Sequence, residues 1–275
     1  MAVLPVGIGP VNGYQISRSL RFNSADSAYL NRTFGTSTNQ YIFTWSGWVK
    51  LARAVEATTN YGYLLDARTA SNDAGFGYLE FYNGNLVFSG WFTTWRITTQ
   101  VFRDPSAWYH IVLAVDTTQA TAANRIKLYV NGSEITAFST NNNPTQNTTV
   151  GINNNSTAAR IGSANPLASS RLFDGYLTEV NFIDGQALTP SSFGQTNAQT
   201  GVWEPKAYSG SYGTNGFYLN FSDNSGTTST TLDKDSSGNG NNWTPNNFSV
   251  TAGVGNDSLV DTPTSYGTDT GVGGE

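Results

Sequence analysis

The first residues to test for catalysis are the six glutamates, because glycoside hydrolysis needs two carboxyl groups about 5 to 9.5 Å apart. They are Glu56, Glu80, Glu134, Glu179, Glu204 and Glu275. None has a second carboxylate two or four residues further along, so no single strand is predicted to carry such a pair on one face. Two distant acids, for example Glu80 and Glu179, could still converge in the fold.

Sulfur chemistry is excluded and imidazole chemistry is limited to one residue. The chain has no cysteine and one histidine, so it has no disulfides, thiolate zinc sites or cysteine nucleophiles. His110 lies in the apolar run WYHIVLAVD, which predicts a packed side chain with one or two hydrogen bonds rather than a general base. Any metal ion would have oxygen ligands.

A loop rich in side-chain oxygens is the main candidate for calcium. Its candidate ligands stand at alternate positions, namely Asp233, Asp235, Ser237 and Asn239. The twelfth position is Thr244 instead of the usual Glu, so we favour a loop of Asx turns, in which Asp and Asn bond the nearby backbone. A rim site near predicted strand ends is a further alternative, with Asp66, Asn72, Asp73 and Asp116 as candidates. No cofactor is required, and calcium stays a candidate.

Tryptophans in polar sequence are the main candidates for binding sugars, because sugar rings stack on aromatic faces while polar side chains bind their hydroxyls. Four tryptophans lie in or beside turn-rich sequence and are predicted carbohydrate contacts: Trp91, Trp95, Trp203 and Trp243. Packing at the edge of the fold is the alternative for each of them.

The elements that would position these residues are short strands. Charged residues make up only 12% of the chain and glycines number 29, which disfavours long surface helices. Hydrophobic residues alternate on both sides of Asn83-Gly84 and of Asn131-Gly132, two pairs typical of tight hairpin turns. The pattern predicts an all-β fold, a two-sheet antiparallel jelly-roll sandwich with an irregular C-terminal extension.

Charge divides the chain unevenly. Residues 209–275 hold one Lys and seven acidic residues, and the whole chain has a net charge of −5. Nucleic acid is therefore not an expected partner. We predict an N-terminal arm at 1–15, a jelly roll at 16–208, an acidic extension at 209–249 that packs on it, and an extended or poorly ordered tail at 250–275. No secretory signal or membrane-spanning run is recognised. The arm is predicted to dock on a partner through its apolar residues, Val3, Leu4, Val6 and Ile8.

Several sequence blocks resemble those of known proteins. LRFNSADSAYL, DPSAWYHIVLAVD, IKLYVNGSEI and FDGYLTEVNFIDGQALTP resemble, in order, the blocks of the laminin-G-like, concanavalin A-like jelly roll over residues 16–195. With GVWEPKAY, GTNGFYLNFSDNS and DSSGNGNNWTPNNFSV, nearly the whole chain is similar to virion proteins of marine bacteriophages, particularly those that infect cyanobacteria. Thr178 departs from the pattern, because many family members have an acid there.

The resemblance implies a non-enzymatic structural protein of the virion, such as a fibre, a spike or a capsid or tail decoration. Its implied partners are other virion proteins and further copies of itself, with a trimer favoured because fibre and spike proteins are commonly trimers. A host surface polysaccharide is a further partner. The alternatives are a dedicated carbohydrate-binding adhesin and a polysaccharide depolymerase of the same fold.

Overall fold

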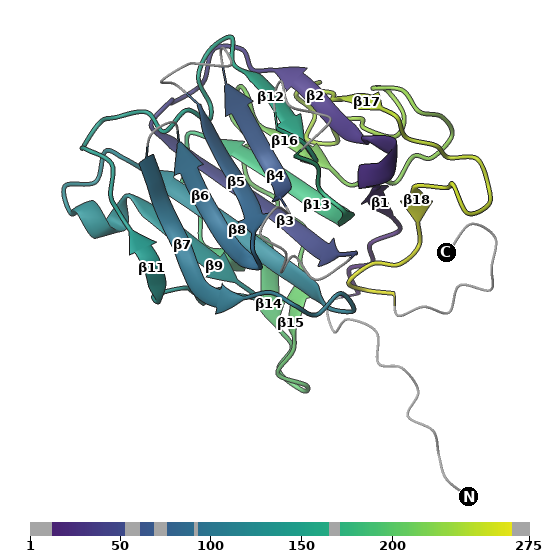
Figure 1. The fold of residues 1–275 in the computed structure, drawn as a ribbon, viewed down its shortest axis with the longest axis horizontal. Coiled ribbons are helices and arrows are strands. Elements are labelled where there is room, and N and C mark those ends of the chain that lie inside the picture. The colour runs from purple at the N-terminus through teal and green to yellow at the C-terminus, as the bar shows by residue number, and fades with distance from the viewer. Residues whose placement is uncertain (1–12, 53–60, 69–75, 91–92, 165–170, 266–275) are drawn as a thin grey trace, which may run out of the picture.

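The computed structural model describes residues 13–52, 61–68, 76–90, 93–164 and 171–265 of the chain. In this part the chain forms two large antiparallel sheets, seen as two layers in Figure 1. Its helical segments are single turns of 3-10 helix, η1 (Ser24–Asp26), η2 (Ala122–Asn124) and η3 (Pro190–Ser192). No helix among the described residues is long and apolar enough to cross a membrane.

Sheet A has the strand order β10-β9-β8-β3-β13-β1-β18, with β16 also paired to β13. Its strands are β10 (Ser133–Glu134), β9 (Ile126–Val130), β8 (Trp108–Asp116), β3 (Ile42–Leu51), β13 (Gly175–Asp184), β1 (Ser19–Phe22), β18 (Ser258–Leu259) and β16 (Phe217–Leu219). The long β3, β8 and β13 form its centre, and side chains on both of their faces are buried.

Sheet B has the order β11-β7-β6-β5-β4-β12-β2-β17. Its strands are β11 (Phe138–Asn141), β7 (Thr93–Val101), β6 (Asn85–Gly90), β5 (Gly77–Tyr82), β4 (Tyr61–Arg68), β12 (Ala158–Ile161), β2 (Tyr29–Thr33) and β17 (Thr244–Asn246). A separate pair, β14 (Gly194–Thr196) and β15 (Trp203–Pro205), follows η3 in the chain. The predicted two-sheet antiparallel sandwich is confirmed.

The main hydrophobic core lies between the sheets and includes Trp45, Phe81, Phe88 and Phe182, each fully buried. Both predicted hairpins are confirmed: β5 pairs with β6 and β9 pairs with β10. Asn83 and Asn131 have φ of 51° and 48°, and the glycines after them have φ of 80° and 82°. These left-handed pairs match the twist of the flanking strands, which is why Asn-Gly occurs at such turns.

A second, smaller cluster covers the outward face of sheet A. Val112 and Ile183 point away from the main core and pack against Phe193. The segment that follows β13 supplies most of the cover, with Leu188, Tyr208 and Tyr212 packed on the same cluster. Since this segment seals the central strands of sheet A, the outward face of sheet B is the better place to search for a binding surface.

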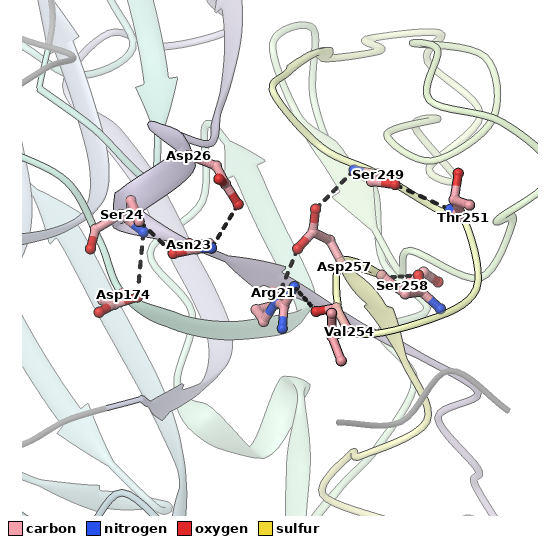
Figure 2. A network of polar contacts seen from close by, with 12 residues as sticks. Arg21, Asn23, Ser24, Asp26, Asp174, Ser249, Thr251, Val254, Asp257 and Ser258 are labelled. Atoms are coloured by element: carbon pink, nitrogen blue, oxygen red, sulfur yellow. Dashed lines mark hydrogen bonds and ion pairs between the residues drawn. The ribbon is translucent and has the colours of Figure 1, made fainter. Parts of the chain in front are cut away.

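The C-terminal segment supplies the last strand of both sheets at one side of the sandwich (Figure 1). β17 pairs with β2 in sheet B, and β18 pairs with β1 in sheet A. Figure 2 shows the contacts near β18, where Arg21 Nε donates to Asp257 Oδ1 at 3.0 Å and the Ser249 amide donates to the other carboxylate oxygen at 2.8 Å. Residues 250–265, predicted as part of a tail, thus include a strand that completes sheet A.

The two ends of the described chain also run side by side. The Ile16 amide donates to Thr264 Oγ1 at 2.8 Å, and Thr262 Oγ1 donates back to the Ile16 carbonyl at 3.2 Å. Further along, Ser19 and Leu259 face each other in the antiparallel β1–β18 pair. The chain therefore enters and leaves the described fold at adjacent places.

Candidate functional site

The outward face of β4 and β5 carries a group of tyrosines. In β5, Leu79 and Phe81 enter the core, so Tyr78, Glu80 and Tyr82 point outward. Residues directly opposite each other on paired antiparallel strands share a face. Three such pairs place further side chains outward: Tyr61 with Tyr82, Tyr63 with Glu80, and Asp66 with Tyr78. We call Tyr61, Tyr63, Tyr78 and Tyr82 the tyrosine patch.

A bulge in β4 makes this arrangement possible. The register between β4 and β5 shifts between Tyr63 and Leu65. Both Leu64 and Leu65 consequently join the core, while Tyr63 before them and Asp66 after them face outward. One extra residue in a strand redirects side chains in this way, and such bulges often lie beside functional sites.

The tyrosine rings lie close enough to form a continuous aromatic surface. Tyr61 and Tyr82 stack with ring centroids 5.0 Å apart, and Tyr63 and Tyr78 have centroids 5.3 Å apart. Tyr63 is fully buried, whereas Tyr61, Tyr78 and Tyr82 are half-buried and keep part of each side chain in contact with solvent. Partly exposed rings of this kind can stack on the C–H face of a sugar.

Charged side chains lie beside the tyrosine patch, and one of them contacts two of its rings. Arg68 donates two hydrogen bonds to Asp66, with Nε–Oδ2 at 2.9 Å and Nη2–Oδ1 at 2.6 Å, and this pair is buried. Arg171 lies over the Tyr61 ring, 4.7 Å from its centroid, and Nη1 donates to the Tyr63 hydroxyl at 3.3 Å. The contacts of Arg171 hold the Tyr61 and Tyr63 rings in place before any ligand arrives.

Glu80 is an unusual carboxyl group at the centre of this face. It is 4% exposed, and its Oε2 atom has no hydrogen-bond partner in the described structure. The pKa of Glu80 is raised to about 8, because burial and the nearby charge of Asp66 outweigh the opposing effects of Arg171 and of a hydrogen bond from Tyr63. Glu80 is therefore mostly protonated at neutral pH, so its hydroxyl can donate a hydrogen bond.

The acids suggested by the sequence for hydrolysis do not converge. Glu179 belongs to β13 in sheet A, whereas Glu80 points outward from sheet B. The Glu179 carboxylate accepts hydrogen bonds from Tyr14 at 2.6 Å and from Tyr218 at 2.7 Å, so its role is to hold segments of the chain together. The carboxyl group near Glu80 is instead that of Asp66, which lies on the neighbouring strand.

Of the four predicted sugar-binding tryptophans, Trp243 is fully buried between Phe34 and Phe217 and presents no ring face to solvent. This placement removes it from the candidates for stacking on a sugar. Trp95 is half-buried and packs against the main core. Trp91 lies outside the described residues.

Trp203 packs on the one histidine. Its Nε1 donates to His110 Nδ1 at 3.0 Å, so the His110 proton lies on Nε2, which donates to Ser46 Oγ at 2.9 Å. Burial lowers the pKa of His110 to about 3, and the imidazole is neutral near pH 7. The prediction of a packed, hydrogen-bonded histidine is confirmed.

Replacing Trp203 with Phe tests how much the Trp203–His110 hydrogen bond contributes to stability. We expect Trp203→Phe to lower the free energy of unfolding by about 1–3 kcal/mol, because a buried imidazole nitrogen loses its donor. Denaturant unfolding measures the loss, and ¹⁵N shifts of His110 report a change of tautomer. The matched control is Trp108→Phe, whose indole bonds the partly exposed Asp261. Equal losses and an unchanged tautomer would contradict the assigned bond.

The loop predicted as a calcium site is held by its own hydrogen bonds. Asp235 Oδ1 accepts from the amides of Tyr218 and Ser237, and Oδ2 accepts from Ser237 Oγ and the Asn241 amide, all at 2.8–2.9 Å. Asn239 Nδ2 donates to two backbone carbonyls. Asp233 is buried, and burial raises its pKa well above the usual range. This pattern fits the Asx-turn interpretation.

Other predicted calcium positions are not brought together. Asp66 is paired with Arg68, and Asp116 Oδ1 accepts bonds from Thr118. Asn72 and Asp73 lie outside the described residues, as do the docking residues Val3, Leu4, Val6 and Ile8. Within the described ranges, no group of three or more His, Cys, Asp or Glu side chains is placed to hold a metal ion.

The sandwich and its sequence match a known family. Residues 22–193 match the model of the laminin-G type described as the concanavalin A-like lectin/glucanases superfamily. The chain belongs to this superfamily. The matched range contains the central strands of both sheets and the whole tyrosine patch, so the patch lies within the part of the chain that the family model covers.

Three solved structures are similar to this superfamily member at low sequence identity. A heptameric pentraxin from Limulus polyphemus is 15% identical, with 63% of this chain and 78% of that chain covered and a TM-score of 0.46. A Bacteroides ovatus protein with a proposed role in carbohydrate binding is 16% identical, with 85% and 59% covered and a TM-score of 0.48. Domains LG4-5 of mouse laminin alpha1 are 14% identical, with 76% and 49% covered and a TM-score of 0.43. No curated protein matches the chain.

The tyrosine patch was not predicted from the sequence, although a signal for it exists. Tyr78, Glu80 and Tyr82 alternate with Leu79 and Phe81, which is the pattern of a strand with one apolar and one aromatic-polar face. Aromatic and polar side chains at every second position of this strand are the sequence signal for the patch.

Proposed function

We propose that this protein is a non-enzymatic structural component of a bacteriophage virion that displays a carbohydrate-binding surface. The observation that carries the binding role is the tyrosine patch, with partly exposed rings at Tyr61, Tyr78 and Tyr82 beside fixed polar groups. Carbohydrate sites combine aromatic faces with a few well-placed hydrogen-bonding groups in the same way. The virion role is supported by the sequence blocks that resemble marine phage proteins.

In this proposed role the protein assembles with other copies of itself, for which we favour a trimer, and with other virion proteins. Several weak sites on one oligomer would raise the effective concentration for a surface polysaccharide. Light scattering of the purified protein tests the oligomer. The apolar arm residues Val3, Leu4, Val6 and Ile8 remain the proposed docking segment for a virion partner.

Binding to host-envelope polysaccharides is the direct test. The protein is incubated with a panel of these polysaccharides, with and without calcium, and both retained binding and released reducing ends are measured. Binding without release supports the proposed function. A dedicated adhesin would bind without assembling into particles.

A depolymerase is the second candidate, because Asp66 and the largely protonated Glu80 lie on neighbouring strands. Release of reducing ends that stops in Glu80→Gln would establish it and overturn the non-enzymatic role.

The tyrosine patch makes a specific prediction for this assay. Tyr61→Ala and Tyr82→Ala should each weaken polysaccharide binding by about three- to tenfold, because an aromatic contact contributes about 0.5–1.5 kcal/mol. The matched control is Tyr176→Ala, which removes a half-buried tyrosine from sheet A. Equal affinities for all three variants would place the sugar site elsewhere.

A further inference from the structure

The outward face of sheet B carries more positive than negative charge, unlike the chain as a whole. The charged side chains on it, among the described residues, are Asp66, Glu80, Arg68, Arg160 and Arg171. Asp66 is neutralised by Arg68 in the buried pair. Glu80 is mostly protonated near pH 7. Arg160 and Arg171 are therefore left as uncompensated cations on a protein with a net charge of −5.

Arg160 is presented outward by the strand next to the patch. Its neighbours Ala159 and Ile161 belong to the core, so alternation directs Arg160 to the outer face. In the sheet it lies between Asn31 on one side and Asp66 on the other. No ion pair joins Arg160 or Arg171 to a described residue.

Aromatic rings and backbone groups hold both guanidinium groups in position. Arg160 lies 4.5 Å from the centroid of Tyr29, and Arg171 lies 4.7 Å from that of Tyr61. Arg160 Nη1 donates to the Ala164 carbonyl at 3.1 Å, and the Ala164 amide donates to the Arg171 carbonyl at 3.0 Å. A guanidinium that rests on a ring keeps N–H groups at its edge free, and such an edge suits a carboxylate or sulfate.

We propose that Arg160 and Arg171 make the site selective for anionic glycans, which carry carboxylate or sulfate groups. Each guanidinium binds an anionic group while the tyrosine patch stacks on the sugar rings between them. The inference rests on the proposed carbohydrate-binding function and adds the class of sugar. An anionic ligand would also account for the net positive charge of this face on an acidic protein, because neutral sugars need no such charge.

Matched ligands separate charge from sugar shape. Calorimetry compares an oligogalacturonate with its carboxyl-reduced neutral form, and a sulfated dextran oligosaccharide with plain dextran. We expect the anionic member of at least one pair to bind about tenfold or more tightly, and its affinity to fall as salt screens the charges. The first pair reports carboxylate recognition and the second reports sulfate recognition.

Variants assign the preference to the two arginines. Arg160→Gln and Arg171→Gln should each reduce affinity for the anionic ligand by about tenfold and leave affinity for the neutral ligand unchanged. The control is Lys127→Gln, which removes the same charge from a half-exposed position on β9 of sheet A. Circular dichroism confirms that each variant folds.

The outcomes separate this inference from the proposed function. Equal binding of anionic and neutral ligands, lost in Tyr61→Ala, would overturn anion selectivity and leave carbohydrate binding intact. Anion preference that Lys127→Gln reduces as much as Arg160→Gln would show a general charge effect and also overturn the inference. Absence of binding to every ligand and to the host polysaccharides would overturn both.

Discussion

The combined contribution of His110 and Glu80 to stability is expected to be highest between about pH 4.5 and 6.5 and to fall on both sides, because burial shifts the pKa values of these two groups in opposite directions. An unfolded histidine binds a proton near pH 6.5, whereas His110 in the fold does so only near pH 3. Protons therefore favour the unfolded chain as the pH falls through this range. The loss reaches about 5 kcal/mol by pH 3.

Glu80 acts in the opposite direction. Its ordinary pKa of 4.5 rises to about 8 in the fold, so the folded chain holds a proton that the unfolded chain has released. Stability from this group is complete below pH 4.5 and is lost as the pH rises to about 8, again by about 5 kcal/mol. Glu179 and Asp233, whose pKa values are also raised by burial, contribute with the same sign.

Denaturant unfolding between pH 3.5 and 8.5 tests both limbs. Glu80→Gln should reduce the slope of the alkaline limb and His110→Gln the slope of the acid limb, because neither amide titrates. The exposed Glu134→Gln serves as the control and should leave the profile unchanged. An alkaline slope in Glu80→Gln equal to that of the original protein would show that Glu80 does not hold the proton.

Trp243 should be essential for folding rather than for binding. We expect Trp243→Ala to lower the free energy of unfolding by about 3–5 kcal/mol, because a large cavity replaces a fully buried ring. The ring meets Phe217 and Phe34 with centroids 5.0 and 6.5 Å away. Denaturant unfolding measures this loss of free energy, and the loss in Trp243→Phe should be clearly smaller because a ring still fills most of the space.

Tyr82→Ala is the comparison for this variant, since it removes a half-buried aromatic ring from the outer face. Its loss of stability should be less than half that of Trp243→Ala, while its loss of polysaccharide binding should be greater. A stable Trp243→Ala protein that no longer binds polysaccharide would instead return Trp243 to the sugar site.

Local chemistry was sufficient to predict much of the fold. The Asn-Gly turns at 83–84 and 131–132 and the alternating side chains beside them depend only on neighbouring residues, and both hairpins form as expected. The prediction that WYHIVLAVD is covered on both faces is also confirmed, because Leu113 enters the main core and Val112 enters the second cluster. These features need no knowledge of distant parts of the chain.

The candidate site depended on information that the sequence does not display. Trp203 and Trp243 both lie in polar sequence. Contacts with residues that are distant in the sequence bury Trp243 fully, and its neighbours in the sequence do not reveal this. Asp66 and Glu80 become neighbours because of the register between β4 and β5, which the bulge near Leu64 sets. Backbone pairing also places residues 258–259 in a sheet, although the segment around them has few large apolar residues.

The side-by-side entry and exit of the chain determines how the fold would respond to force. A pull applied through residues 14 and 265 would act on the same end of the antiparallel β1–β18 pair. Its hydrogen bonds would then open one after another, as in a zipper, instead of resisting together in shear. Detachment of β18 would also break the hydrogen bond between Arg21 and Asp257. Tension would therefore release the C-terminal edge first and leave the tyrosine patch on β4 and β5 in place.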